Sequence, residues 1–157
     1  MFKPIIILAA IVASFTTNAA ELHGKVTRVL DGDTLEVLQD GAPVRVRLLN
    51  IDAPEKRQDY GRSAADELKT LIHNAPVSVF YDKTDRYGRT LGIVTNSTGQ
   101  QVNREMVRAG AAWVYTRYNE DDTLAAIEKD AREHKRGLWQ QANAVAPWEF
   151  RHHKKGA

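Results

Sequence analysis

Apolar and polar residues alternate along the first half of the chain, which predicts β-strands. The alternation covers residues 22–30 and 34–38, and Gly32 lies in the short turn between them. An Asp-Gly step between two alternating stretches is a strong signal for a hairpin, because glycine accepts a positive φ at little cost. A second turn leads into residues 44–49, where the alternation resumes. The pattern therefore predicts a meander of three strands.

The apolar spacing changes after Pro54, a residue that a central strand does not tolerate. From Ser63 onward apolar residues recur at helical intervals, and Ser63 with Asp66 resembles an N-cap arrangement. Further along, the pattern predicts strands at 77–81 and 90–94 and helices at 102–109 and 122–136. This order of elements predicts an α+β protein, a five-stranded OB-fold β-barrel with three α-helices.

The first residues of the chain have the layout of a secretory signal peptide. Lys3 gives a short positive start, residues 5–15 form an almost uninterrupted apolar run, and small residues follow. The run is too short for a permanent membrane span, so cleavage is favoured over an uncut membrane anchor. We therefore expect residues 1–20 to be a signal peptide that is cut after Ala19 or Ala20. The protein is then expected to be exported, periplasmic or secreted, with no membrane attachment after cleavage.

The part that follows the signal peptide fits a single domain in length. We expect this domain to cover residues 21–140 and residues 141–157 to form a C-terminal tail, whose end at residues 151–155 is solvated and frayed. The basic end of the tail would add only non-specific attraction to polyanions. The chain has no cysteine and no internal repeat, which argues against a disulfide scaffold and a solenoid. Nothing in the sequence specifies an oligomer, so a monomer is expected.

Charge composition alone does not identify a partner. The net charge of +2 comes from 22 basic and 20 acidic residues, whereas nucleic-acid-binding domains often have a stronger basic excess. The five histidines show no zinc-ligand spacing, and thiolate ligands are absent from the sequence. The positions of individual charges must therefore show which partner the protein binds.

Some charged side chains lie where a strand-forming sequence has little structural use for them. Taken singly, each has an ordinary explanation as a turn residue, part of a solvated face or a strand edge. Together they combine carboxylates that suit an oxygen-seeking cation such as Ca²⁺ with two arginines that can hold a phosphate. Phosphodiester hydrolysis requires such groups, because negative charge gathers on the phosphate in the transition state. These residues are Asp33, Arg47, Asp52, Glu55 and Arg89.

The segments that carry these residues resemble the active-site blocks of the staphylococcal (micrococcal) nuclease family, the thermonuclease-like proteins. They read DGDT at 31–34, RLLNIDAPE at 47–55 and DRYGR at 85–89. Residues 102–110 resemble the family's second helix, and GLW at 137–139 resembles its usual close. The resemblance covers nearly all of the chain after the signal peptide, and it implies a nuclease-like OB-fold domain.

The resemblance implies a calcium site. Asp33 and Asp52 would bind Ca²⁺ directly, and the backbone carbonyl of Ala53 would be a further ligand. The family's best-known member has threonine at the position of Ala53. A carbonyl ligand survives that difference, whereas any side-chain contact is lost. Ca²⁺ is therefore the expected cofactor.

The resemblance also implies how the phosphodiester is cut. Glu55 would hold a water near the metal and act as general base, while Arg47 and Arg89 would grip the scissile phosphate. The family cuts DNA and RNA on the 5′-oxygen side and leaves 3′-phosphate ends, so DNA and RNA are the expected substrates. The loop at residues 56–62 is shorter than the family's, so substrate preference and rate do not carry over.

Further substrate contacts are expected from Arg86, Tyr87 and Tyr115. Aromatic rings stack on bases with little sequence preference, and an arginine can contact phosphates. Core packing is an equally open role for Tyr115, and solvation of the loop is an equally open role for Arg86. Trp139 and Trp148 are expected to pack rather than to bind.

A non-catalytic OB-fold module is the alternative function. Such a module would bind single-stranded nucleic acid or a protein partner. It would have no reason to keep carboxylates and arginines at these spacings, so the sequence favours the endonuclease.

Overall fold

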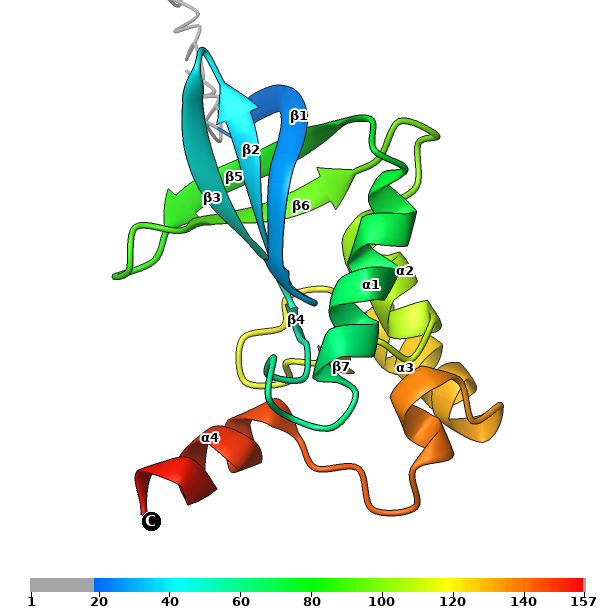
Figure 1. Ribbon diagram of the computed structural model, residues 1–157. Helices are drawn as coiled ribbons and strands as arrows, with labels where there is room; N and C mark the ends of the chain where they lie inside the picture. Colours follow the sequence, from blue (N-terminus) through cyan, green and yellow to red (C-terminus); the bar gives the residue numbers. More distant parts are fainter. Residues whose placement is uncertain (1–18, 157) are drawn as a thin grey trace, which may run out of the picture.

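The structure, a computed structural model, describes residues 19–156. Except for Ala19 and Ala20, the predicted signal peptide lies outside the described residues. A closed barrel is formed by β1 (Ala20–Asp31), β2 (Thr34–Gln39), β3 (Ala42–Leu48), β5 (Pro76–Thr84) and β6 (Thr90–Thr95). The strand order is β1-β2-β3-β6-β5, and neighbours are antiparallel except β3 and β6, which run parallel (Figure 1). The predicted five-stranded OB-fold barrel is confirmed.

Alternating side chains fill the interior of the barrel. In β2, Leu35 and Val37 are completely buried, whereas the residue between them is only half-buried. Leu35 lies opposite Val46 of β3, so the apolar faces of the two strands meet inside. A slip of one residue would turn these faces to solvent, which fixes the register. The same register sets Arg47 opposite Thr34, beside the β1–β2 turn.

Within residues 19–156 the helices are α1 (Gly61–Ile72), α2 (Val102–Arg108), α3 (Leu124–Glu133), the 3₁₀-helix η1 (Gly137–Gln140) and α4 (Pro147–Lys155). In the view of Figure 1, α1 and α2 lie to the lower right of the barrel, and the remaining helices lie below it. The first three α-helices are the predicted ones, and α4 is additional. α1 buries Ala64, Leu68 and Ile72, which are spaced at helical intervals, against the core. None of these helices within residues 19–156 has the length and apolar character needed to cross a bilayer.

The start of α1 differs from the predicted one. Tyr60 is the N-cap residue, with a φ of 69°, and Ser63 lies inside the first turn, so the predicted Ser63 N-cap is wrong. The chain before the helix is wound tightly: the carbonyl of Glu55 accepts the N–H of Gln58, and the carbonyl of Gln58 accepts the N–H of Gly61. A Cβ on Gly61 would lie 2.0 Å from the Glu55 carbonyl oxygen. This close approach leaves room only for glycine at the first position of the helix.

A small second sheet lies at the end of the barrel and was not predicted from the sequence. It pairs β4 (Ile51–Asp52) with β7 (Trp113–Val114), and Asp52 lies opposite Trp113. Two-residue strands carry too little alternation to be recognised from sequence. The pairing nevertheless fixes the backbone of Asp52 against a segment from the distant second half of the chain.

Gly32 has a different role from the predicted one. Gly32 does not have a positive φ, unlike several other glycines within residues 19–156. A Cβ at this position would instead lie 2.7 Å from the Cβ of Ala53 and 2.8 Å from the Cβ of Ala64. Glycine is therefore required by close packing of the β1–β2 turn against the segment after β4 and against α1.

The predicted frayed end at residues 151–155 is wrong, because residues 147–155 form the helix α4. Pro147 is the first residue of the helix, a position whose N–H makes no hydrogen bond within the helix, so proline fits there. Pro147 is buried together with Ala146. The side-chain amide of Gln58 donates a hydrogen bond of 2.6 Å to the carbonyl of Val145 just before the helix. Apolar burial and this bond hold α4 beside the end of the barrel (Figure 1).

Candidate active site

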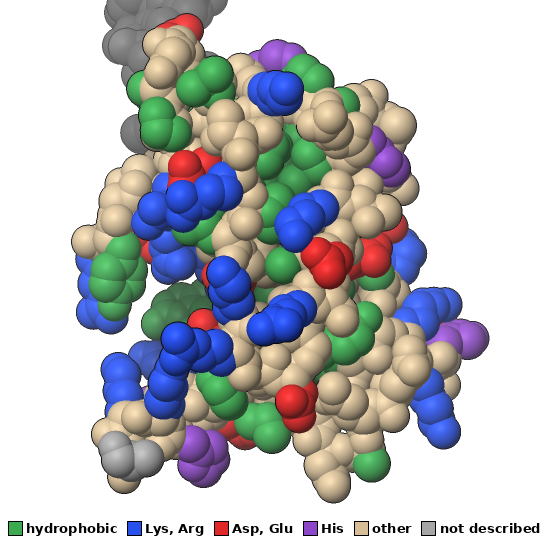
Figure 2. Space-filling view, viewed as in Figure 1, with side chains coloured by type: hydrophobic (Ala, Val, Ile, Leu, Met, Phe, Trp, Pro, Cys, Tyr) green, Lys and Arg blue, Asp and Glu red, His purple; other side chains and the backbone are tan. Residues whose placement is uncertain are grey.

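A pocket of about 630 Å³ opens between the end of the barrel and α4. This volume is in the range of small-molecule and cofactor sites. All the site residues expected from the sequence line it: Asp33, Arg47, Asp52, Ala53, Glu55, Arg86, Tyr87, Arg89 and Tyr115. Figure 2 shows Lys and Arg side chains gathered around the hollow between the barrel and the C-terminal helix. Residues that the sequence analysis did not assign to the pocket also line it: Asp31, Thr116, Arg117, Trp148, Arg151, His152 and Lys155.

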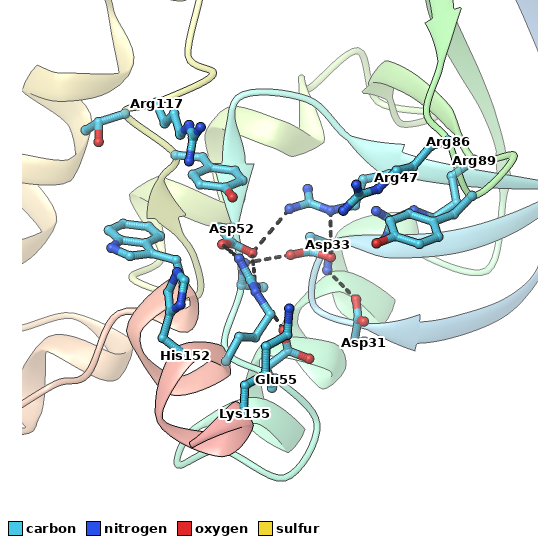
Figure 3. Close-up of a pocket in the computed structure, with 16 residues that line it drawn as sticks. Asp31, Asp33, Arg47, Asp52, Glu55, Arg86, Arg89, Arg117, His152 and Lys155 are labelled. Atoms are coloured by element: carbon cyan, nitrogen blue, oxygen red, sulfur yellow. Dashed lines mark hydrogen bonds and ion pairs between the residues drawn. The ribbon is translucent and has the colours of Figure 1, made fainter. Parts of the chain in front are cut away.

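The floor of the pocket carries buried aspartates held by backbone groups. Asp33 accepts the N–H of Ala53 at 2.7 Å through Oδ2 and the hydroxyl of Thr34 at 3.0 Å through Oδ1. The N–H of Asp33 itself donates to Asp31 Oδ1 at 3.0 Å. The β1–β2 turn and the end of β4 thereby bring Asp31, Asp33 and Asp52 to one place (Figure 3).

Arg47 lies between two of these carboxylates. Its Nε is 3.3 Å from Asp33 Oδ1, and its Nη2 is 3.2 Å from Asp52 Oδ1. Its Nη1 donates to the backbone carbonyls of Leu48 and Ile51. Arg47 is buried, so its charge is compensated inside the protein rather than by water. The guanidinium therefore both neutralises the floor and orients the two aspartates.

A loop after β5 brings a second arginine to the rim. Asp85 accepts the backbone N–H groups of Tyr87 and Arg89, and its Oδ2 lies 2.7 Å from Arg89 Nε. Arg86 lies over the ring of Tyr87, with its Cζ 4.9 Å from the ring centroid. Lys83, near the end of β5, pairs with Glu120 at 3.5 Å. The loop thus presents two arginines and an exposed tyrosine to the pocket (Figure 3).

Arg151 closes the pocket from the side of α4. Its Nη2 is 2.7 Å from Asp52 Oδ2, and its Nη1 is 3.2 Å from Asp52 Oδ1 and 2.9 Å from Glu55 Oε1. The sequence did not indicate this residue, because its charged C-terminal stretch is typical of a solvated chain end. The signal that could have found it is Pro147, a favoured first residue of a helix, followed at once by Trp148.

The aspartates perturb one another's protonation. Burial, and then the neighbouring charge of Asp33, raise the pKa of Asp31 to about 7. Burial also raises the pKa of Asp52 although Arg151 and Arg47 oppose it. Burial opposes ionisation of Asp33, but the charge of Arg47 and hydrogen bonds to the carboxylate keep its pKa below the ordinary value. Burial thus makes Asp31 and Asp52 harder to ionise than an ordinary aspartate, whereas Asp33 is easier to ionise.

Burial works against the charged form of Arg151. Its hydrogen bonds to Asp52 and Glu55 outweigh burial and raise the pKa of the guanidinium. Arg151 therefore stays charged while it lies over the carboxylates.

An aromatic wall faces the carboxylates. Tyr115 and Trp148 are stacked, with ring planes 4° apart and centroids separated by 5.5 Å. Trp148 also packs edge-on against Trp113 at 5.6 Å, and Trp113 packs against Trp139 at 4.5 Å. Trp148 therefore packs against other aromatic rings, as expected, and also lines the pocket. Tyr115 is half-buried, packs against Trp148 and lines the pocket too.

The donor set of the floor fits a hard cation in its chemistry. Asp33, Asp52 and Glu55 offer only oxygen atoms, and a nearby cation would favour the charged form of Asp52, whose pKa burial raises. Within residues 19–156, however, no group of three or more acidic or histidine side chains is arranged closely enough to hold a metal. Arg47 and Arg151 occupy the carboxylate oxygens instead.

This arrangement can bind a phosphodiester. Guanidinium groups surround a buried anionic floor, and exposed aromatic rings lie beside them. Arginine donors match phosphate oxygens, and rings can stack on bases.

Known proteins resemble the chain over nearly its whole length. The family model described as staphylococcal nuclease homologue matches residues 45–141. The chain is 52% identical over 147 residues to an uncharacterized endonuclease of Escherichia coli O157:H7, with 94% of this chain and 96% of the relative covered. It is 44% identical over 142 residues to protein ParB of Escherichia coli, with 84% of this chain and 80% of the relative covered. It is 40% identical over 162 residues to a micrococcal nuclease of Shigella flexneri, with 96% and 93% covered. The chain therefore belongs to the staphylococcal nuclease family, as its sequence predicts.

Proposed function

We propose that the protein is a calcium-dependent endonuclease that hydrolyses phosphodiester bonds of DNA and RNA. One observation carries the proposal: three carboxylates and two arginines from separate segments line one pocket. Relatives named endonuclease and micrococcal nuclease support the reaction class. The residues in question are Asp33, Arg47, Asp52, Glu55 and Arg89.

In this proposal Asp33 and Asp52 hold the Ca²⁺ ion, with the backbone carbonyl of Ala53 as a further ligand. Both aspartates are nearly inaccessible to solvent, and the Ala53 N–H fixes the Asp33 carboxylate. Such pre-orientation lowers the entropic cost of forming a ligand cage. When bound, the ion supplies positive charge that stabilises the phosphate and helps to position water.

The side chains of the chain then carry out the bond exchange. Glu55 accepts a proton from the attacking water as the water oxygen bonds to phosphorus. The bond from phosphorus to the 5′ oxygen breaks, and that oxygen keeps the electron pair and takes up a proton from solvent water. The products are a 3′-phosphate and a 5′-hydroxyl end. Arg47 and Arg89 donate hydrogen bonds to the phosphate oxygens. Within residues 19–156, the Arg89 side chain donates a hydrogen bond to Asp85, and it does so through Nε. Both terminal nitrogens of Arg89 are therefore available to donate to a phosphate.

Digestion of single-stranded DNA and of RNA tests the proposal. The purified protein is compared in calcium and in chelator, beside Glu55→Gln and a control, Glu133→Gln, which alters an exposed carboxylate of α3. We expect cutting only with calcium, a loss of about 10²–10⁴-fold in Glu55→Gln, and normal rates in the control. The products should block polymerase extension until a phosphatase removes their 3′-phosphates.

Two other outcomes would contradict parts of this proposal. Binding of single strands without cutting would favour the non-catalytic OB-fold module. Cutting that survives in Glu55→Gln would mean that the general base is another residue.

We also propose that the protein is exported and that residues 1–20 are removed. The apolar run at residues 5–15, followed by small residues, supports this. Cell fractionation and N-terminal sequencing should find a mature chain that begins at Ala20 or Glu21. A chain that keeps Met1 in the cytoplasmic fraction would contradict export.

A further inference from the structure

Arg151 makes contacts that the proposed function does not use. Its guanidinium spans both oxygens of Asp52, at 2.7 and 3.2 Å, and also reaches Glu55 Oε1 at 2.9 Å. Bidentate arginine–carboxylate pairs are among the strong hydrogen-bonded ion pairs in proteins. One side chain therefore engages two of the carboxylates proposed to serve the cation and the attacking water.

The fold builds this contact from a remote part of the chain. Arg151 is 99 residues from Asp52 and 96 from Glu55 in sequence. It lies one helical turn after Trp148, whose ring is stacked on Tyr115 and packs against Trp113. These contacts anchor α4, so Arg151 does not share the freedom of a solvated tail.

The oxygens of Asp52 are already committed to guanidinium groups. Oδ1 accepts from Arg47 and from Arg151, each at 3.2 Å, and Oδ2 accepts from Arg151 at 2.7 Å. A carboxylate oxygen has two lone-pair positions, so the two arginines fill both positions of Oδ1, and Arg151 takes one of the two positions of Oδ2. A calcium ligand must offer a lone pair at about 2.3–2.6 Å from the ion, and an adjacent guanidinium would repel that ion. Arg151 and a cation therefore compete for the same carboxylate.

We propose that Arg151 sets the cation affinity of the site by acting as an internal competitor for Asp52 and Glu55. This inference rests on the proposed metal-dependent function. Without a cation, the guanidinium of Arg151 neutralises the two carboxylates and keeps α4 against the pocket. Binding of a cation to Asp52 displaces Arg151, and the site binds the cation more weakly by the free energy of the broken contacts.

Calcium titration by calorimetry tests the competition on the full mature protein. The variants are Arg151→Met, which keeps an apolar stem of similar length, and Arg151→Lys, which keeps the charge without the planar fork. A matched control is Arg108→Met, which removes a half-exposed arginine paired with Glu105 on α2. We expect Arg151→Met to bind calcium on the order of tenfold more tightly than the wild type, a change typical of coupled sites. Arg151→Lys should fall between the two, and Arg108→Met should match the wild type.

The other outcomes would contradict either the competition alone or the proposed metal dependence as well. Equal or weaker calcium binding by Arg151→Met, with near-UV circular dichroism unchanged, would overturn the competition while leaving the proposed function intact. If Arg151→Met does not fold, an unchanged affinity in Arg151→Lys would overturn it. If the folded wild type and variants all bind no calcium, the proposed metal dependence fails, and the competition fails with it.

Discussion

The carboxylate of Asp33 and the backbone N–H of Ala53 form a 2.7 Å hydrogen bond between residues 20 positions apart. This bond ties the β1–β2 turn to the segment that follows β4. Because Ala53 directly follows Asp52, the bond also holds Asp33 at a fixed position relative to Asp52. One contact thus couples the stability of the turn to the geometry of the carboxylate floor.

Two substitutions of Asp33 should separate this bond from the charge. Asp33→Asn keeps an oxygen for the Ala53 N–H, whereas Asp33→Ala leaves that buried group without an acceptor. We expect the alanine variant to be less stable than the asparagine variant by about 1–3 kcal/mol. Both should lose calcium binding, since both lack the charge. Urea denaturation and calcium calorimetry measure the two effects, and equal stabilities of the variants would contradict the role of the bond.

Gly32→Ala should damage the fold and the site together. The added Cβ would meet the Cβ atoms of Ala53 and Ala64 at 2.7 and 2.8 Å. Overpacking of this kind lowers the free energy of unfolding by about 1–3 kcal/mol. Relief of the clash would also move the turn away from Asp52. We expect a lower urea midpoint and weaker calcium binding. Gly99→Ala is a useful contrast, because its Cβ meets nothing within 4 Å and its cost should come only from the positive φ of 84°.

Asp31 should make the stability of the metal-free protein depend on pH. Its folded-state pKa is raised from 3.8 to about 7, so the neutral form is favoured in the native protein. The stability that this provides is fully present below about pH 3.8 and is lost as the pH rises through 7. In chelator, Asp31→Asn should therefore exceed the wild type in stability by about 1–2 kcal/mol at pH 8, a value discounted for partial solvation.

The difference between Asp31→Asn and the wild type should shrink toward pH 5. Urea melts across this range measure it. Asp40→Asn, in an exposed turn, provides the control. A difference that stays constant with pH would show that Asp31 titrates as an ordinary carboxyl.

Tyr115→Leu should weaken substrate binding more than it slows the chemistry. Tyr115 lines the pocket and is stacked on Trp148, so its ring extends the aromatic wall beside the arginines. Loss of stacking on a base costs about 1–3 kcal/mol. We expect KM for single-stranded DNA to rise by about tenfold or more while kcat changes little. Phe80→Leu, which alters an exposed aromatic residue of β5, should leave both constants unchanged. A fall in kcat alone would contradict a role in binding.

The sequence by itself determined the barrel and most of the candidate site. Alternation with a period of two is a local property, because burial of one strand face requires it. The strands of the barrel could therefore be predicted within a few residues. The segments around Asp33, Arg47, Asp52, Glu55 and Arg89 were recognisable as short motifs, and the structure brings all of these side chains into one pocket.

Only the tertiary structure decided the contacts between distant segments. The β4–β7 pairing depends on a partner about sixty residues away, and two-residue strands carry no periodic signal. The packing role of Gly32 depends on Ala53 and Ala64, whereas the sequence indicated only a turn. Helix α4 is short and highly charged, so its stability comes from docking rather than from its own propensity. Its arginine reaches Asp52 and Glu55 because the completed fold brings the C-terminal helix against the segment that follows β4, and no local pattern records that approach.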